Sequence, residues 1–228
     1  MNASAPFSSF SSIVVFDVET TGLDSRFDTI IEFGGIKVTG ESGNPTVSEE
    51  ADLLIRLPEG KTLGSNITQL TGITPAMLSE HGVAPQLAAE TIAGRFLGPD
   101  TLLVAYNAQF DLCFLYRFLK RYGREGSLRG IKMLDALTVY KDRRPYPHKL
   151  CNAIESYRLS GQNSHRALDD AKATWELLGA MHEECADLEQ YVNLFGYHPR
   201  YGISGPRISS ITYRAQEYSA GKKLYLLH

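Results

Sequence analysis

The feature that most constrains the fold is the order in which strand-like and helix-like segments follow one another in the sequence. Three runs rich in apolar and β-branched residues come first, at 13–16, 29–38 and 47–57, with a turn at 41–45 between the last two. Their tight connections predict an antiparallel meander. The glycine pair 34–35 inside the second run predicts a close approach of another backbone segment.

After this meander the pattern changes to an alternation of helices and strands. Apolar runs at 101–106 and 131–134 predict a fourth and a fifth strand. Apolar periodicity, prolines in first turns and a terminating Gly123 indicate the helices. These helices are expected at 75–81, 85–96, 108–122, 149–157 and 167–184. The sequence therefore predicts an α/β fold, with a mixed five-stranded sheet and helices on both faces.

The length of the chain allows one substantial core. A single α/β domain of 228 residues buries roughly 70–75% of its unfolded surface. We expect a flexible N-terminus at 1–11, a principal domain at 12–185 and a C-terminal appendage at 186–228, where glycine and proline interrupt any long helix. Within the appendage, 208–213 and 224–227 are expected to pair as a hairpin.

Several classes of protein are disfavoured by features that the sequence lacks. No stretch approaches 18 consecutive apolar residues, so no membrane association is expected. The first residues lack the basic and apolar regions of a secretory signal, and three scattered cysteines without a CxxC pair argue against a disulfide framework. A cytoplasmic location is therefore expected. The P-loop and nucleophile-elbow motifs are also missing.

Two acidic residues stand where the first predicted strand ends. Asp17 and Glu19 are two positions apart, so on a strand their side chains project from the same face. Carboxylates held close repel one another unless one is protonated or a cation lies between them, and Mg²⁺ prefers such oxygen ligands. The alternative is an ordinary solvated acid at a strand end, and this pair alone does not decide between the two.

Two further polar clusters lie where helices begin. Asn107 and Asp111 follow the fourth strand, at the edge where α/β sheets place ligands. A plain N-cap and an acid favoured by the helix dipole would explain them equally well. His165 precedes the last helix and Asp170 lies in its first turns. Imidazole is the side chain best suited to accept a proton near neutral pH, although a surface histidine is the simpler interpretation.

Taken together, the three clusters are far more specific. The motif D-x-E-T-T-G-L at 17–23, N-A-x-F-D at 107–111 and H-x₄-D at 165–170 resemble the DEDDh superfamily of 3′–5′ exonucleases, particularly the proofreading epsilon subunit of bacterial replicative polymerase and its stand-alone relatives. The resemblance covers roughly 12–182. It implies a ribonuclease-H-like sheet with helices on both faces, in agreement with the pattern of segments.

The resemblance also implies a role for each matching residue. Asp17, Glu19 and Asp170 match the ligands of one catalytic Mg²⁺ or Mn²⁺ ion, Asp17 bridges to a second ion, and Asp111 acts through its water shell. His165 matches the general base. The residues implied to contact the terminal nucleotide are Thr20, Leu23, Asn107 and Phe110. Two metal ions can serve both the attacking and the leaving oxygen of a phosphodiester, which suits this chemistry.

Charge is distributed unevenly around a net value of −3. Residues 116–149 contain ten Lys or Arg against three Asp or Glu, whereas residues 1–115 contain five against fourteen. This asymmetry predicts a positive surface beside an acidic centre, although a solvated helix face is the more common origin of such a run. We expect the basic segment, Arg143 and Arg144 in particular, to bind the nucleic-acid backbone upstream of the cleaved end.

The expected function is hydrolysis of a single-stranded DNA 3′ end, or an RNA 3′ end, with release of nucleoside 5′-monophosphates, as in proofreading or repair. The alternative is a non-catalytic nucleic-acid-binding or adaptor subunit, but such a protein would not need all four acids and the histidine. A polymerase or sliding clamp is a candidate partner. Residues 190–195 faintly resemble a clamp-binding peptide, although one face of a short amphipathic helix is the commoner explanation.

Overall fold

A mixed five-stranded sheet forms the centre of the protein. The computed structural model describes residues 9–40, 45–161, 163–218 and 221–227. The strands lie in the order β3-β2-β1-β4-β5, with antiparallel pairing among the first three and parallel pairing from β1 to β5. Their bounds are β1 (Ser12–Thr20), β2 (Ile30–Thr39), β3 (Thr46–Leu54), β4 (Thr101–Ala105) and β5 (Lys132–Asp135). The predicted mixed sheet is confirmed.

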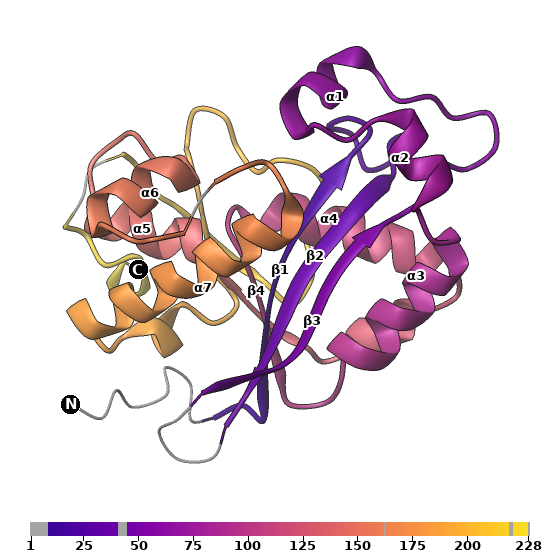
Figure 1. Ribbon diagram of the computed structural model, residues 1–228. Helices are drawn as coiled ribbons and strands as arrows, with labels where there is room; N and C mark the ends of the chain where they lie inside the picture. Colours follow the sequence, from indigo (N-terminus) through magenta and orange to yellow (C-terminus); the bar gives the residue numbers. More distant parts are fainter. Residues whose placement is uncertain (1–8, 41–44, 162, 219–220, 228) are drawn as a thin grey trace.

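Helices cover both faces of this sheet, as predicted (Figure 1). One face carries α5 (Ala136–Arg143), α6 (Leu150–Tyr157) and α7 (Ala167–Glu184). The other carries α3 (Pro85–Thr91), its π-helical continuation (Ile92–Phe96) and α4 (Ala108–Arg121). Beyond one end of the sheet lie α1 (Ser65–Thr71) and α2 (Pro75–Glu80). Helices α1 and α5 were not expected from the sequence.

The alternation of side chains along β1 places Asp17 and Glu19 on the face of the sheet that α7 covers. Val14, Phe16 and Val18 belong to the hydrophobic cluster on the α3–α4 face. Ile13 and Val15 belong to the cluster on the α5–α7 face. Because side chains alternate between faces along a strand, the odd-numbered acids that follow on β1 share the α7 side of the sheet.

The N-terminus of α7 packs closely against β2 at Gly34, one of the two glycines from which a close backbone approach was predicted. A Cβ atom built on Gly34 would lie 2.0 Å from the carbonyl carbon of Ala167, so only glycine allows this approach. Beside it, the fully buried Glu32 accepts hydrogen bonds from Arg166 Nε at 2.8 Å and from the Ala167 amide at 2.9 Å. The predicted close backbone approach is therefore present at Gly34.

The C-terminal residues form a small second sheet and not the predicted hairpin. Strand β6 (Leu194–Tyr197) pairs in parallel with β7 (Thr212–Ala215), and Leu224–Leu226 is a turn of 3₁₀-helix, η4. Another 3₁₀ turn, η3 (Leu188–Tyr191), precedes β6. The hairpin prediction was wrong because the two segments find better partners elsewhere: β7 pairs with β6, and Leu224 is fully buried in the α5–α7 cluster.

A buried carboxylate on α5 anchors this C-terminal region. Asp142 accepts hydrogen bonds from the Leu224 amide at 2.5 Å, from Gln216 Nε2 at 2.7 Å and from the Tyr191 hydroxyl at 2.9 Å. Burial raises the pKa of Asp142, and these three donors act in the opposite direction. The C-terminal residues therefore share the core of the domain. The division at 185 stays a proposal, and residues 1–8 of the expected flexible N-terminus lie outside the described residues.

Candidate active site

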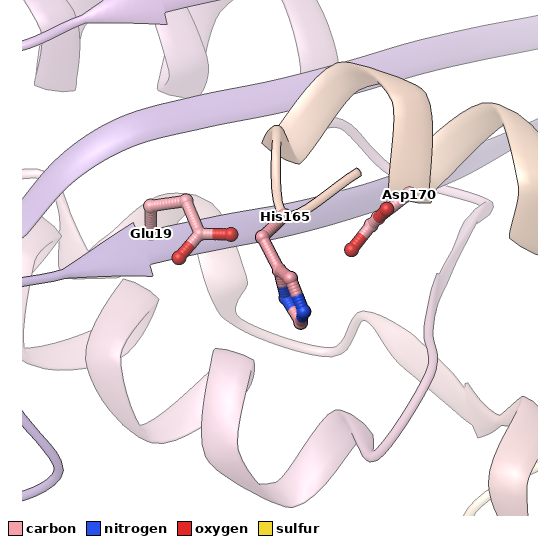
Figure 2. A group of neighbouring side chains, drawn as sticks. All are labelled: Glu19, His165 and Asp170. Carbon is pink, nitrogen blue, oxygen red and sulfur yellow. The ribbon is translucent and has the colours of Figure 1, made fainter. Parts of the chain in front are cut away.

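Three side chains from separate parts of the chain converge at the end of β1 (Figure 2). Glu19 is the penultimate residue of β1, His165 lies in the loop before α7, and Asp170 lies in the first turn of that helix. One ligand atom from each lies within 4.8 Å of the other two. This spacing is compatible with a shared metal ion, because carboxylate and imidazole groups are both common metal ligands.

Two further acids border this group without belonging to the 4.8 Å set. Asp17 precedes Glu19 on the same face of β1, and Asp111 lies in the first turn of α4, only 2% exposed. The Asp111 carboxylate accepts a hydrogen bond from the Val18 amide at 3.2 Å, which fixes it beside the strand. Strand β1 also has an irregular register between Glu19 and Thr20, a distortion common next to active sites.

The acids perturb one another strongly. Burial, followed by repulsion from Asp111, Glu19 and Asp170, raises the pKa of Asp17 well above its ordinary value. Burial is also the main cause that raises the pKa of Glu19 to about 8, that of Asp111 to about 8 and that of Asp170 to about 6. Four carboxyl groups therefore share a region that disfavours their charge. Divalent cations would relieve this repulsion, so the donor set fits such ions.

The loop before α7 holds His165 in an uncommon conformation. Its φ angle is +55°, in the left-handed region that side chains other than glycine rarely adopt. Asn163 Nδ2 and the Ser164 amide donate to the two carboxylate oxygens of Asp170, at 2.6 and 3.1 Å. The neighbouring Asp169 is exposed and accepts from the Ser164 hydroxyl instead. Asp170 is therefore the acid that faces the cluster, as the H-x₄-D spacing implied.

Asp135 is a supporting residue to which the sequence motifs assigned no role. This buried carboxylate at the end of β5 accepts from the amides of Asn107 and Ala108, at 3.0 and 3.1 Å. Asp135 thereby caps the N-terminus of α4, a role that the sequence allowed for Asn107. The side chain of Asn107 is exposed and makes no capping hydrogen bond. The signal available in the sequence was an acid at the end of the last strand, next to a helix start.

Two of the four residues implied to contact the terminal nucleotide, Leu23 and Phe110, line a groove of about 540 Å³, whereas Asn107 borders a separate cavity. Leu23 is 87% exposed, and Phe110 packs against Phe114 with ring centroids 4.8 Å apart. Thr20 is buried and its hydroxyl donates to the Gly22 carbonyl at 2.6 Å. The groove is lined by Leu23, Asp24, Ser25, Arg26, Gln109, Phe110, Cys113, Phe114, Arg117, Ser204, Gly205 and Pro206. Nucleotide contact by Thr20, Leu23, Asn107 and Phe110 stays a prediction.

The comparison with known families decides the class of this site. The exonuclease family model matches residues 14–178. The chain belongs to the exonuclease family. Its membership of the DEDDh 3′–5′ exonuclease superfamily, predicted from three short motifs, is thereby confirmed.

Sequence relatives agree with this assignment. The PolC-type DNA polymerase III of Latilactobacillus sakei is 31% identical over 192 residues, which are 83% of the exonuclease and 12% of the polymerase. That of Clostridium perfringens is 35% identical over 169 residues, 72% of the exonuclease and 11% of the polymerase. The exonuclease therefore spans a small part of these relatives.

The same fold occurs in Exonuclease I. The Escherichia coli enzyme, solved in complex with a dT13 oligonucleotide, superposes with a TM-score of 0.68 and 19% identity. The superposition covers 78% of the chain described in this structure and 42% of the E. coli chain. Exonuclease I from Methylocaldum szegediense gives a TM-score of 0.68 and 24% identity, over 78% and 41%. At these identities the likeness establishes the fold.

Two arginines of the basic segment, Arg143 and Arg144, have a structural role that the number of charges in the segment did not indicate. Arg143 is almost fully buried and donates to Asp187 at 2.6 Å and to the Met181 carbonyl at 2.5 Å. Arg144 pairs with Glu184 at 2.8 Å. They fasten α5 to the end of α7, so the expectation that both bind nucleic acid was wrong for Arg143 and has no support for Arg144. From the same segment, Arg117 does line the groove.

The segment that resembles a clamp-binding peptide is part of the core. Tyr191 is 1% exposed and Phe195 is 2% exposed. Tyr191 also donates to the buried Asp142. The exonuclease thus uses these aromatic side chains to attach its C-terminal region.

Among the described residues, no helix has the length and apolar character needed to cross a membrane.

Proposed function

We propose that this exonuclease hydrolyses the terminal phosphodiester bond of single-stranded DNA from the 3′ end, with divalent cations, and releases nucleoside 5′-monophosphates. The observation that carries the proposal is the convergence of Glu19, His165 and Asp170 within 4.8 Å, beside Asp17 and Asp111, whose pKa values are raised. A non-catalytic adaptor would gain nothing from carboxylates that repel one another.

The carboxylates are the proposed holders of the cations. We assign Asp17, Glu19 and Asp170 as direct ligands and Asp111 as a ligand through water, with Mg²⁺ or Mn²⁺ as the ions and two as their number. When bound, such ions activate water and offset the charge that develops on the leaving oxygen. His165, exposed at the mouth of the cluster, accepts the proton of the attacking water. The bonds from Asn163 and Ser164 keep Asp170 in place for this arrangement.

The groove lined by Phe110, the residue before Asp111, supports a single-stranded substrate. Leu23 and Phe110 offer apolar surfaces on which a terminal base can stack whatever its identity, and Arg26 and Arg117 border the same groove. The complex of E. coli Exonuclease I with an oligonucleotide is consistent with DNA as the substrate class. RNA is the second candidate, because discrimination depends on how the 2′-hydroxyl is met. The PolC-type relatives favour a role beside a polymerase, in proofreading or repair.

The test compares matched DNA and RNA 20-mers, each labelled at the 5′ end, with purified protein in Mg²⁺ and in EDTA. We expect the labelled DNA to shorten stepwise from its 3′ end in Mg²⁺ only, with 5′-monophosphates as products. Asp170→Asn should abolish the reaction, and Asp169→Asn, its exposed neighbour, should not. Binding without any product from the wild-type protein would favour the adaptor function, and faster shortening of RNA would make RNA the substrate.

A further inference from the structure

A row of four aromatic rings lies on the surface and has no role in the proposed chemistry. Tyr146 contacts Tyr218 with ring centroids 5.3 Å apart, Tyr218 contacts His198 at 4.5 Å, and His198 contacts Tyr201 at 4.9 Å. We call these four residues the aromatic row. One comes from the α5–α6 connection and three from the C-terminal region.

The tyrosines of the aromatic row are too exposed to contribute mainly to the core. Tyr201 is 70% exposed, Tyr146 67% and Tyr218 40%. A cluster of large exposed rings on a globular protein marks a binding surface more often than a structural one. The row is also held in place, because His148 packs against both Tyr146 and Tyr218 and its Nε2 pairs with the Arg144 carbonyl at 2.9 Å.

Two neighbouring cavities border the aromatic row. The first, of about 200 Å³, is bordered by Asn107, four positions before Asp111, and by three members of the row. The second, of about 520 Å³, is bordered by the remaining member and by Lys149. The two cavities share Lys141 and Tyr218. The two cavities therefore form a track along the aromatic row, and one end of this track lies at Asn107, directly before the helix that carries Asp111.

The charge along this track suits a phosphate backbone. The Lys141 side chain is half-buried and, within the described part of the chain, has no hydrogen bond or ion pair, although the charge of Asp135 attracts it. Burial lowers its pKa, a cost that a bound phosphate would offset. Lys149 is exposed at the far end. The carboxylate that borders the track is Asp135, whose oxygens already accept from the Asn107 amide and the Thr138 hydroxyl.

We propose that the aromatic row is a base-stacking platform for the single strand upstream of the cleaved linkage, with Lys141 and Lys149 contacting its phosphates. The inference rests on the proposed function, because it assumes a single-stranded nucleic acid whose 3′ end lies at the acids. Aromatic rings beside a positive track bind single strands without sequence preference. Each stacked base should strengthen binding about 5- to 150-fold.

The test measures kcat/KM in Mg²⁺ for a series of oligothymidylates from two to twelve nucleotides. For the wild-type protein we expect kcat/KM to rise with length and then level off. Tyr201→Ala should lower kcat/KM at least fivefold for the twelve-nucleotide substrate and leave the dinucleotide unchanged. Tyr201→Phe, which keeps the ring, should behave like the wild type. Tyr116→Ala removes another exposed tyrosine, one outside both cavities, and should change nothing.

Three outcomes would overturn the proposal: an equal loss on the dinucleotide and the twelve-mer, no loss on the twelve-mer, or a loss in Tyr201→Phe as large as in the alanine variant. Thermal unfolding shows whether Tyr201→Ala is folded, and Tyr146→Ala serves as the second variant. If the wild-type protein cleaves none of these substrates, the proposed function fails. Fluorescence anisotropy with a labelled twelve-mer then still compares binding by the wild type and by Tyr201→Ala.

Discussion

The acid cluster should make the metal-free protein less stable as the pH rises, and Asp111→Asn should remove much of this dependence. The folded-state pKa of Asp111 is about 8, whereas its ordinary value is 3.8. The folded protein therefore keeps a proton that the unfolded chain releases. Stability linked to this group is complete below about pH 4 and is lost progressively as the pH rises to about 8.

The size of the effect follows from one proton per molecule. A difference of one bound proton changes the free energy of unfolding by about 1.4 kcal/mol per pH unit, or about 3 kcal/mol between pH 5 and 7. The asparagine variant keeps an oxygen that can accept from the Val18 amide, so the hydrogen bond at 3.2 Å survives the change. Glu19, whose pKa is about 8, adds to the slope in both proteins.

Urea unfolding in EDTA at pH 5, 6, 7 and 8 measures this slope. Asp111→Asn should gain stability relative to the wild type as the pH rises, by about 3 kcal/mol between pH 5 and 7. Mg²⁺ should stabilise the wild type more than the variant, because it binds the ionised cluster. Asp169→Asn, an equal charge change at an exposed site, should keep the wild-type slope. Parallel slopes for the wild type and Asp111→Asn would refute the reasoning.

Three further substitutions test separate parts of the structure. Gly34→Ala should destabilise the protein by more than about 2 kcal/mol in urea unfolding, because its Cβ would meet the backbone of α7, whereas Gly94→Ala, with open space around it, should be neutral or stabilising. Arg143→Ala should cost about 1.5–3 kcal/mol, because Asp187 loses one of its two cationic partners and keeps Lys223, while DNA affinity measured by anisotropy stays the same. His165→Ala should lower the single-turnover rate by roughly 10²–10⁴-fold with nearly unchanged affinity, and a near wild-type rate would exclude it as the base.

The part of the fold that local patterns determine could be predicted from the sequence. The span of α7, Ala167–Glu184, agrees with the prediction because apolar periodicity and a polar start mark it within its own residues. The same holds for the end of β1, where alternation alone placed Asp17 and Glu19 on one face. The pairing of His165 with Asp170 was implied by the H-x₄-D motif of the family, and the first turn of α7 brings the two side chains together.

The features that escaped prediction depend on partners far along the chain. The C-terminal region is organised by Asp142, which bonds to Leu224 from 82 positions away, and no local pattern reports such a contact. Helix α1 has the sequence SNITQLT, poor in strong helix formers. Arg143 carried the charge of a nucleic-acid ligand, but its partners, Asp187 and the last turn of α7, decide its role.

Repelling carboxylates are held together by hydrogen bonds to Asp111 and Asp170 and by further contacts that involve none of the four acids. Glu32 is itself negative and is, after burial, the largest influence that raises the pKa of Glu19. It is nevertheless placed there because it binds Arg166 and the Ala167 amide, which fixes the start of α7 and with it His165 and Asp170. The close packing of Gly34 against the same turn adds a restraint that does not depend on charge. The site can therefore keep its geometry while its acids oppose it, and this preorganisation is what cation binding requires of the metal-free protein.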